Sequence, residues 1–447
     1  MTERAMTERA MTERALTERA TAERGMTARA LAEPSPAERP SRTLETSARP
    51  VELSERRGRA LVLDAETTKA LAVVRALGQT MEVRTASRRR PALAAWSRFA
   101  HEHLRCAAAS DADLVRWVRD ACREHRIDVV LCPEETSSWL LARDRAAIED
   151  AGVLLPLPPR GVLEIAMDKA RTLEAARSAG VPVPPTIVLE DAAQARGAAR
   201  ELGWPVVVKP RWSQFWTGDR FVACGGVSYA AGEADLERAM ARQPSAAPPP
   251  LLQRFVPGDG LGIFFVLAPD GTVAAEFAHE RLRDLRPTGS GSVLRRSVRV
   301  DPELREMALA LLRRIGWWGV AMVEFRGDRS GGRRFLMEIN GRFWGSLQLS
   351  IDAGVNFPRI LVEVANGEVT PPPRYREGVV LRWWFGDLAR VGRVLRGRPP
   401  GYAGAFPSRL EGIGQFLGPQ PPRTRNEILR WEDPLPAIGE VLSLLRR

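Results

Sequence analysis

Short apolar runs in this chain alternate with longer stretches in which apolar residues recur every three or four positions. The runs RALVLD, MEVRTA and IDVVLCP are typical of buried strands, and TTKALAVVRALG and DADLVRWVRDACREHR, which lie between them, have helical spacing. Strands that alternate with helices of this length predict a parallel sheet, so we expect an α/β domain over residues 58–160. The first turn, LDAETTKAL, lacks G-x-G-x-x-G, which argues against a dinucleotide-binding fingerprint.

The pattern changes after the proline-rich run LLPLPPRG, which marks a domain boundary near residue 160. Beyond it we expect a helix in MDKARTLEAARSAG, a short buried strand in WPVVVKP and a hairpin about Pro269–Gly271. A helix in DPELREMALALLRRIG precedes WGVAMVEFRGDRSGGRRFLMEIN, which predicts a second hairpin through its glycine-rich turn. The second part of the chain is therefore expected to be α+β.

The two ends of the chain have a different composition. Residues 1–57 begin with a tandem MTERA repeat, whose period of five forms no apolar stripe, and continue rich in Pro, Ser, Arg and Glu. We predict a disordered N-terminal extension with no catalytic part. Residues 371–447 are rich in Arg and Pro and should contain one or two helices. This C-terminal region could line a site for an acidic substrate, mediate dimerisation or simply be solvated.

The overall composition narrows the class of protein. Of 447 residues, 44% are hydrophobic and 27% charged, which is ordinary for a globular protein, and no apolar run approaches the roughly 20 residues of a membrane helix. The four cysteines show no C-x-x-C pair and are expected to be reduced, mostly buried thiols of a cytoplasmic protein. The net charge of +11 suggests nucleic-acid binding as one class of function. No basic block is interleaved with aromatic residues, however, so that class is not favoured.

The clearest candidate chemistry lies in FLMEINGRFWGSL. Glu338, Asn340 and Arg342 occupy alternate positions and should share one face of a strand, with Phe335, Met337 and Ile339 on the other. Glu324 lies on the preceding strand. It shares the face of Glu338 in any strand register in which the residue numbers of two directly opposite residues add up to an even number. Two such carboxylates repel each other, and a bridging divalent cation such as Mg²⁺ would remove the repulsion. The alternative is a surface hairpin with solvated acids.

Lysine is rare enough in this chain to be informative. Of 66 Lys and Arg residues, only Lys69, Lys169 and Lys209 are lysine. A compact ammonium can sit between phosphate oxygens where a planar guanidinium does not fit, which makes Lys169 and Lys209 candidates for a phosphate site. The alternative for Lys209 is a strand-end lysine that extends into solvent. We expect Lys69 to lie on a helix surface.

Taken together, these segments resemble the ATP-grasp superfamily of carboxylate–amine and carboxylate–thiol ligases. The resemblance covers roughly residues 60–370 and is carried by DK, VVVKP, Q-x-F-V-P-G and VEF…MEIN; the segment MEINGRFWG resembles the branch of carbamoyl-phosphate synthetase and predicted carboxylate–amine ligases. It implies an ATP-grasp fold with a Rossmann-like N-terminal (pre-ATP-grasp) domain at 58–160. A lid subdomain with both lysines would span 161–255, and a subdomain with the metal hairpin 256–370.

The resemblance also implies a role for each matching residue. ATP would contact Lys169, Lys209, the hinge residues Gln253, Arg254, Phe255 and Val256, and Asp259 at the ribose. The metal, Mg²⁺ or alternatively Mn²⁺, would be held by Glu324, Glu338 and Asn340. Arg281 and Arg283 would bind the substrate carboxylate, and Arg295 and Arg342 would act on the transferred phosphoryl group.

Two departures from the pattern leave details open. Many relatives have an acid in the hinge where this chain has Arg254, and the loop after Lys209 is not a plain glycine-rich loop. Trp212 and Trp216 in that loop either cover a ligand or pack the lid.

The implied reaction joins a carboxylate to an amine. The carboxylate would attack the γ-phosphate of ATP to give an acyl phosphate, and the amine would then displace phosphate, which needs positioning and charge neutralisation rather than a protein nucleophile. The partners would be small-molecule carboxylate and amine substrates, without nucleic acid or membrane, and a homodimer stays open. The alternative from another class is a non-catalytic regulatory protein that binds nucleotide.

Overall fold

The structure is a computed structural model, and it describes residues 58–89, 92–327 and 332–445. All of them lie in one compact unit. The disordered extension expected at 1–57 lies outside the described residues, as do both termini of the chain.

The N-terminal domain contains the parallel sheet that the sequence predicts. Its strands are β1 (Arg59–Val62), β2 (Glu82–Ser87), β3 (Glu102–Arg105) and β4 (Val129–Leu131), in the order β3-β2-β1-β4. All three pairings are parallel. Its helices are α2 (Thr68–Leu77), α3 (Leu114–Glu124), α4 (Glu135–Arg143), α5 (Arg145–Glu149) and a 3-10 turn, η1 (Leu93–Trp96). The sequence analysis missed β3, because its residues EHLR are largely polar and bury mainly Leu104.

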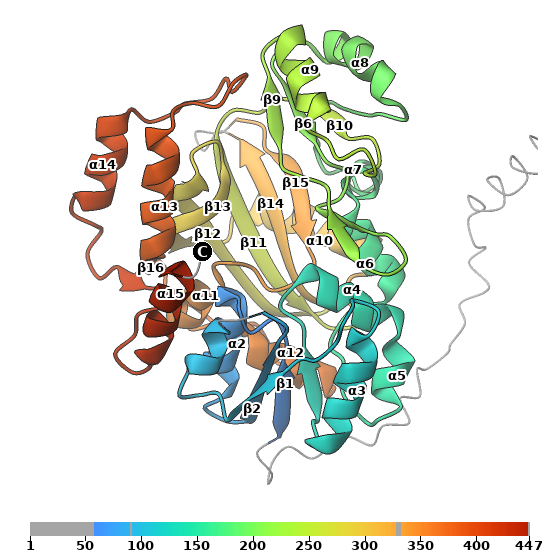
Figure 1. Ribbon diagram of the computed structural model, residues 1–447, viewed down its shortest axis with the longest axis vertical. Helices are drawn as coiled ribbons and strands as arrows, with labels where there is room; N and C mark the ends of the chain where they lie inside the picture. Colours follow the sequence, from blue (N-terminus) through green and yellow to red (C-terminus); the bar gives the residue numbers. More distant parts are fainter. Residues whose placement is uncertain (1–57, 90–91, 328–331, 446–447) are drawn as a thin grey trace, which may run out of the picture. The chain divides into compact units, whose positions relative to one another are not determined.

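The segment expected to form the lid, which we call the lid below, contains a second, antiparallel sheet of order β5-β10-β6-β9. Its strands are β5 (Thr186–Val188), β6 (Val206–Lys209), β9 (Ser228–Ala230) and β10 (Leu251–Arg254), covered by α8 (Ala195–Leu202) and α9 (Glu233–Ala241), as Figure 1 shows. A small hairpin, β7 (Gln214–Trp216) and β8 (Phe221–Ala223), interrupts it. Two helices, α6 (Arg160–Met167) and α7 (Lys169–Ser178), and a 3-10 turn, η2 (Ala192–Gln194), complete this part; the single helix expected around residue 170 is therefore α7.

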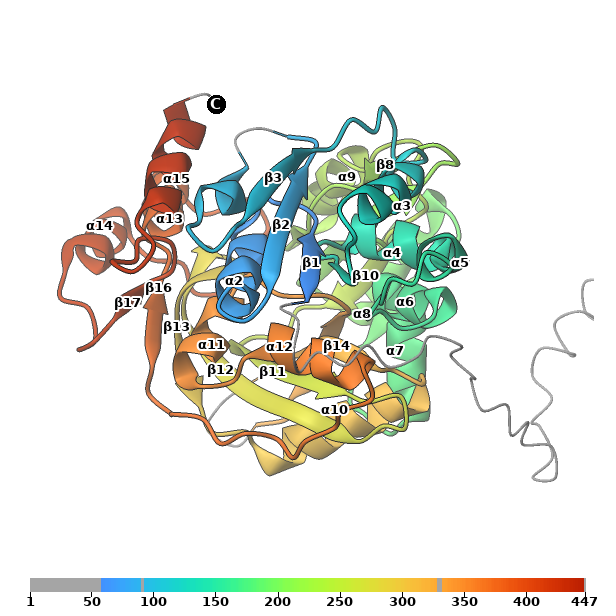
Figure 2. The same ribbon diagram turned by 90° about the horizontal axis from the view of Figure 1, so that it is seen from below.

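The largest sheet has seven strands in the order β15-β14-β11-β12-β13-β16-β17. The strands are β11 (Asp259–Leu267), β12 (Val273–Arg286), β13 (Ser290–Val298), β14 (Gly319–Gly327), β15 (Phe335–Asn340), β16 (Val380–Arg382) and β17 (Arg425–Asn426). Both expected hairpins are present in it. One face packs on α10 (Pro302–Arg314), and the other packs on α11 (Leu347–Ala353) and α12 (Phe357–Ala365) (Figure 2).

The faces of this sheet follow from alternation along its strands. In β11, Ile263 and Phe265 enter the apolar core shared with α10, whereas Phe264 and Val266 enter the core shared with α12. Met322 of β14 lies in the same core as Phe264. Glu324, two residues further along β14, therefore lies on the same face of the sheet as the core shared with α12.

The C-terminal region forms more structure than the one or two helices expected. It contains α13 (Trp384–Leu395), α14 (Arg409–Leu417), α15 (Leu435–Leu445) and two strands. Of these strands, β16 pairs with β13 and β17 pairs with β16, so the region completes the largest sheet. The sequence could not show this, because strands of two or three residues have no readable alternation.

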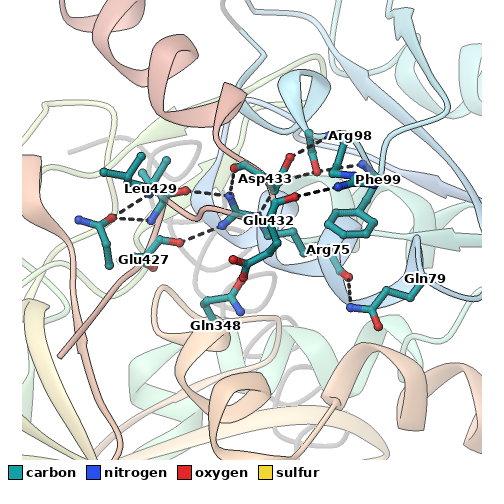
Figure 3. Close-up of polar contacts among 12 residues, drawn as sticks. Arg75, Gln79, Arg98, Phe99, Gln348, Glu427, Leu429, Glu432 and Asp433 are labelled. Carbon is teal, nitrogen blue, oxygen red and sulfur yellow. Dashed lines mark hydrogen bonds and ion pairs between the residues drawn. The ribbon is translucent and has the colours of Figure 1, made fainter. Parts of the chain in front are cut away.

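A buried ionic network attaches this region to the N-terminal domain. Figure 3 shows Asp433 among polar groups from both segments. The Arg75 guanidinium of α2 donates from Nε to Asp433 Oδ2 over 2.8 Å, and the backbone N–H of Arg98 donates to Oδ1 over 2.9 Å. Arg75 also donates to the carbonyl oxygens of Glu427 and Ile428. Asp433 is fully buried and Arg75 is 6% exposed, so each charge depends on the other.

We therefore predict that Asp433→Ala destabilises the protein strongly. Removing one partner leaves the Arg75 charge buried and unpaired, which typically costs about 3–5 kcal/mol of unfolding free energy. The matched control is Asp120→Ala on the exposed face of α3, which should stay within about 0.5 kcal/mol of wild type. Urea unfolding measures both variants. Equal stability of Asp433→Ala and the control would show that this network does not hold the C-terminal region in place.

Candidate functional site

The centre of the site is a pair of carboxylates on adjacent strands. Glu324 of β14 lies directly opposite Glu338 of β15, which confirms that the two acids share a face. The Asn340 side-chain amide donates to Glu338 Oε1 over 3.0 Å. Asn340 lies opposite Met322, so all three predicted metal ligands extend from one patch of the sheet.

The expected alternation of apolar residues along β15 is wrong at its start. The register shifts between Glu324 and Phe325, so that Leu336, not Met337, is opposite Phe325. Such a bulge adds one residue to a strand and reverses the side-chain directions beyond it. Leu336 and Ile339 are consequently the buried residues, and Met337 lines the same cavity as Glu338.

Burial and neighbouring charges act differently on the two acids. Burial raises the pKa of Glu324, although Arg281 donates to it over 3.0 Å and opposes the rise. For Glu338 burial also acts upward, but Lys169, the Asn340 amide and the other cations outweigh it and lower its pKa. One acid therefore ionises more readily than the other, as expected for two interacting carboxylates.

Lys209 ends strand β6 of the lid and points its ammonium toward this pair. Its Nζ donates to Gln253 Oε1 over 2.7 Å, and Gln253 Nε2 in turn donates to Thr186 over 2.9 Å. Burial, partly offset by Glu338, lowers the pKa of Lys209 to about 8. Lys209 is thus not a solvated strand-end lysine, and the buried Gln253 side chain fixes its position.

Lys169 is brought near the same acids by a second ionic contact. Asp168 caps helix α7 by accepting from the Ala170 N–H over 3.0 Å. Arg211, which follows β6, donates to both oxygens of Asp168 over 2.8 and 2.7 Å. This paired contact, which the sequence analysis did not identify, connects the start of α7 to the strand that carries Lys209.

A cavity of about 170 Å³ connects the lid to the carboxylate pair. It is lined by the predicted residues Lys209, Gln253, Arg254, Phe255, Val256, Arg281, Glu324 and Glu338, together with others that include Tyr229, Arg326 and Met337. The Arg254 side chain turns away to donate to the Leu202 carbonyl oxygen over 3.0 Å, so it offers only its backbone. Asp259 begins β11 opposite Gly327 and is exposed.

Two other predicted arginines, Arg283 and Arg295, form ion pairs with the C-terminal region. A bulge in β12 sets Arg281 opposite Arg295 but Arg283 opposite Leu294, so Arg281 and Arg283 point to opposite faces. Arg283 pairs with Asp387 of α13. Arg295 is 1% exposed and pairs with Glu427. The roles of Arg283 and Arg295 toward substrate and phosphate stay predictions.

The expectation that Lys69 lies on a helix surface is wrong. Its side chain is 11% exposed, its Nζ lies 2.6 Å from Glu134 Oε1, and burial together with Arg342 lowers its pKa to about 8. Arg342, just after β15, therefore lies between the metal hairpin and the N-terminal domain, since its charge also acts on Glu338 and Glu135.

Lys69 belongs to a polar group that the sequence analysis missed, formed by Asp64, Glu66, Glu134 and Glu135. These residues follow β1 and β4, whose carboxyl ends adjoin the topological switch point of the parallel sheet. Asp64 accepts from Ser137 Oγ over 2.6 Å, and burial raises its pKa to about 7. The acidic turns LDAETT and CPEETS were a readable signal, because ligands of open α/β sheets bind beyond such strand ends.

Trp216 in the loop after Lys209 packs on the N-terminal domain. Its ring lies 5.5 Å from Trp139 of α4 and 5.3 Å from Phe221. The Phe221 N–H donates to Asp111 over 2.8 Å. These contacts favour packing for Trp216, and Trp212 is stacked by Arg211 at 4.4 Å.

The donor set can be tested against the implied metal. Among the described residues, no group of three or more His, Cys, Asp and Glu side chains could hold an ion by itself. Glu324 and Glu338, together with the amide oxygen of Asn340, form a set of two carboxylates and one amide in which every donor atom is oxygen. Mg²⁺ is commonly bound by one or two carboxylates together with substrate phosphates, so these residues fit a metal that arrives with a nucleotide.

Comparison with known proteins finds similarity over parts of the chain. Residues 248–385 match the family described as "ATP-grasp in the biosynthetic pathway with Ter operon". A D-alanine–D-alanine ligase from Ectopseudomonas mendocina (strain ymp) is 43% identical over 65 residues, which covers 14% of this chain and 20% of that relative. The chain therefore matches only a small part of this curated relative's length.

Two solved structures share the fold. The biotin carboxylase domain of 2-oxoglutarate carboxylase from Hydrogenobacter thermophilus superposes with a TM-score of 0.57 at 18% identity, over 72% of this chain and 73% of that one. N5-carboxyaminoimidazole synthetase from Staphylococcus aureus gives a TM-score of 0.57 at 17% identity, over 72% and 81%. The chain therefore has the fold of these two ATP-grasp structures, and residues 248–385 are similar to the ATP-grasp family described above.

The lowered pKa of Lys209 can be measured directly, because the chain has only three lysines and their NMR signals should be separated easily. After reductive ¹³C-methylation, NMR should show few lysine signals, and the signal lost in Lys209→Arg should titrate near pH 8 instead of about 10.4. Because burial disfavours the charged form, the ammonium should lose its proton as the pH rises through 8. Lys69→Arg assigns the other signal expected near 8. Titration of the Lys209 signal above pH 10 would show that this ammonium is solvated.

Proposed function

We propose that the protein is an ATP- and Mg²⁺-dependent ligase that activates a carboxylate for attack by an amine. The observation that carries the proposal is the direct opposition of Glu324 and Glu338 in one cavity with Lys209 and the hinge residues. Two half-buried acids in this position need cations, and lysines and arginines from three separate segments supply some of them.

The residues divide the work of binding a nucleoside triphosphate. Glu324, Glu338 and Asn340 would hold Mg²⁺, which supplies charge neutralisation on the phosphate oxygens when it is bound. Lys209 and Lys169 would contact phosphates as point charges, and Arg281 would steady Glu324. The backbone at Phe255 and Val256 borders the same cavity and would face the base.

The hinge backbone is only partly free for this purpose. The Phe255 N–H donates to the Pro205 carbonyl oxygen over 3.1 Å. Within the described part of the chain, the Val256 N–H makes no backbone hydrogen bond. We therefore assign adenine recognition to the Val256 N–H and a neighbouring carbonyl oxygen.

The chemistry needs no protein nucleophile. The substrate carboxylate attacks the γ-phosphate in line, ADP leaves, and the amine then attacks the acyl carbon of the acyl phosphate and expels phosphate. The protein's part is to orient both substrates and to neutralise negative charge as it moves. Arg342 would neutralise part of this charge, a role supported by the action of its own charge on both Glu338 and Glu135.

The acidic group beyond Arg342 suits the second substrate. Asp64, Glu66, Glu134 and Glu135 lie at the switch point of the N-terminal sheet, and carboxylates there favour an ammonium. We assign the amine to this group and the carboxylate to the space between it and the metal hairpin. The homodimer stays a prediction, and the assignment of both substrates is to their chemical class.

The named relatives are consistent with this class. The Hydrogenobacter domain was solved with MgADP, ADP and bicarbonate, and the Staphylococcus enzyme with ADP. The E. mendocina relative is a ligase by name.

The activity itself is tested by ADP formation. With ATP and Mg²⁺, a screened mixture of carboxylates and amines should stimulate ADP release well above ATP alone, and omission of either class should abolish the stimulation. Nucleotide binding without stimulated ADP release by any mixture would favour the alternative, a non-catalytic nucleotide-binding protein.

The metal assignment predicts a specific loss in Glu338→Gln. Removing one charged ligand should weaken MgATP binding roughly tenfold to a hundredfold, since a hydrogen bond or contact to a charged group is worth about 1.5–3 kcal/mol. In EDTA, the variant should bind ATP as well as or better than wild type, because one repelling carboxylate is gone.

Isothermal titration with and without Mg²⁺ measures both effects. Glu237→Gln, an exposed acid on α9, is the matched control and should change neither. Identical Mg²⁺ dependence in Glu338→Gln and wild type would remove the metal assignment.

A further inference from the structure

A second cavity, of about 390 Å³, lies between the lid and the C-terminal region. The lid contributes β9 and α9 to its wall, and the opposite side is formed by the end of β12, the last turn of α13 and the loop that follows. No predicted role covers these residues.

The charge of this cavity is strongly unbalanced. Its lining includes five arginines, Arg238, Arg242, Arg286, Arg393 and Arg396, and one carboxylate, Asp235. Asp235 already pairs with Arg238. Within the described ranges, no carboxylate forms an ion pair with any of the other four arginines.

These cations lie close enough to affect one another. Burial, Arg286 and Arg396 together lower the pKa of Arg393, in that order of effect. Like charges gathered around one cavity without a counterion are unfavourable, and an anion between them removes the repulsion.

Four of the five arginines are exposed and Arg393 is half-buried, but the backbone that carries them is closely packed. The loop after α13 approaches β9 so closely that a Cβ on Gly401, which has φ +71°, would lie 2.4 Å from the Tyr229 carbonyl oxygen. Tyr229 Oη donates to the Thr288 carbonyl oxygen over 3.0 Å, and its ring lies 4.8 Å from Tyr402. Lid, β12–β13 turn and C-terminal loop therefore meet in one fixed arrangement.

This cavity adjoins the nucleotide cavity but differs from it in chemistry. Tyr229, Arg286 and Thr288 line both. Lys209, Glu324 and Glu338 line only the smaller cavity, so a ligand in the larger one would not meet the carboxylate pair.

We propose that the larger cavity is a second binding site, for a small molecule with at least two adjacent negative charges, such as a phosphate monoester or a polycarboxylate. Guanidinium groups bind both kinds of anion through paired hydrogen bonds. The volume falls in the range of small-ligand sites. The site does not depend on nucleotide binding, so the proposed function and this proposal can fail separately.

The test is isothermal titration of the nucleotide-free protein with two probes, citrate and glycerol 2-phosphate, at low and constant ionic strength. At least one probe should bind at a single saturable site. Arg393→Gln/Arg396→Gln should weaken that binding roughly tenfold or more, because it removes two charged contacts. Arg242→Gln, which changes only the exposed end of α9, should weaken it as well and provides a second variant if the first does not fold.

Two controls separate this site from other effects. Arg105→Gln/Arg123→Gln removes the same charge from exposed positions of the N-terminal domain and should leave binding within about twofold of wild type, because single exposed charges contribute little. Lys209→Gln, in the nucleotide cavity, should also leave it unchanged.

The outcomes decide the proposal and the ligand class. Binding of citrate alone identifies a polycarboxylate site, and binding of glycerol 2-phosphate alone identifies a phosphate site. Absence of saturable binding for both probes, equal loss in both arginine double variants, or loss only in Lys209→Gln would overturn the proposal.

Discussion

The mutual repulsion of two half-buried carboxylates is the constraint on which the rest of this structure depends. Glu324 and Glu338 lie directly opposite each other on neighbouring strands and are only partly exposed, so solvent screens their charges weakly. Such a pair persists in a fold only when cations compensate it. Arg281 compensates Glu324 from within the same sheet, and the Asn340 amide supports Glu338.

The remaining parts of the chain are connected to this centre by ionic contacts. The lid contributes Lys209, fixed by Gln253, and Lys169 follows through the contact of Asp168 with Arg211. The N-terminal domain faces the hairpin across Arg342. The C-terminal region pairs Glu427 with the buried Arg295 and is itself attached to α2 through Asp433. The site is therefore assembled by long-range ionic contacts, while the apolar cores hold the sheets that present it.

The sequence revealed those parts of the site that local periodicity determines. Alternation along FLMEIN correctly placed Glu338 and Asn340 on one face of the strand. The expected strand register also correctly placed Glu324 on that face. The bulges beside Met337 and after Arg281 could not be predicted, because an inserted residue is defined only by the strand that pairs with it. Lys69 was misjudged for a similar reason: its helix is amphipathic in sequence, but its first turn faces Glu134 of a distant segment. The short strands of the C-terminal region carry no periodic signal at all.

The most direct test of the central claim is to locate a divalent cation in crystals grown with Mn²⁺ and ADP. Anomalous scattering identifies Mn²⁺ independently of the coordinates. Our account predicts a peak within coordination distance of both Glu324 and Glu338, with the ADP phosphates reaching toward Lys209. An ordered ADP whose Mn²⁺ lies away from these carboxylates, or a pair that still contacts only Arg281 and Asn340, would contradict it.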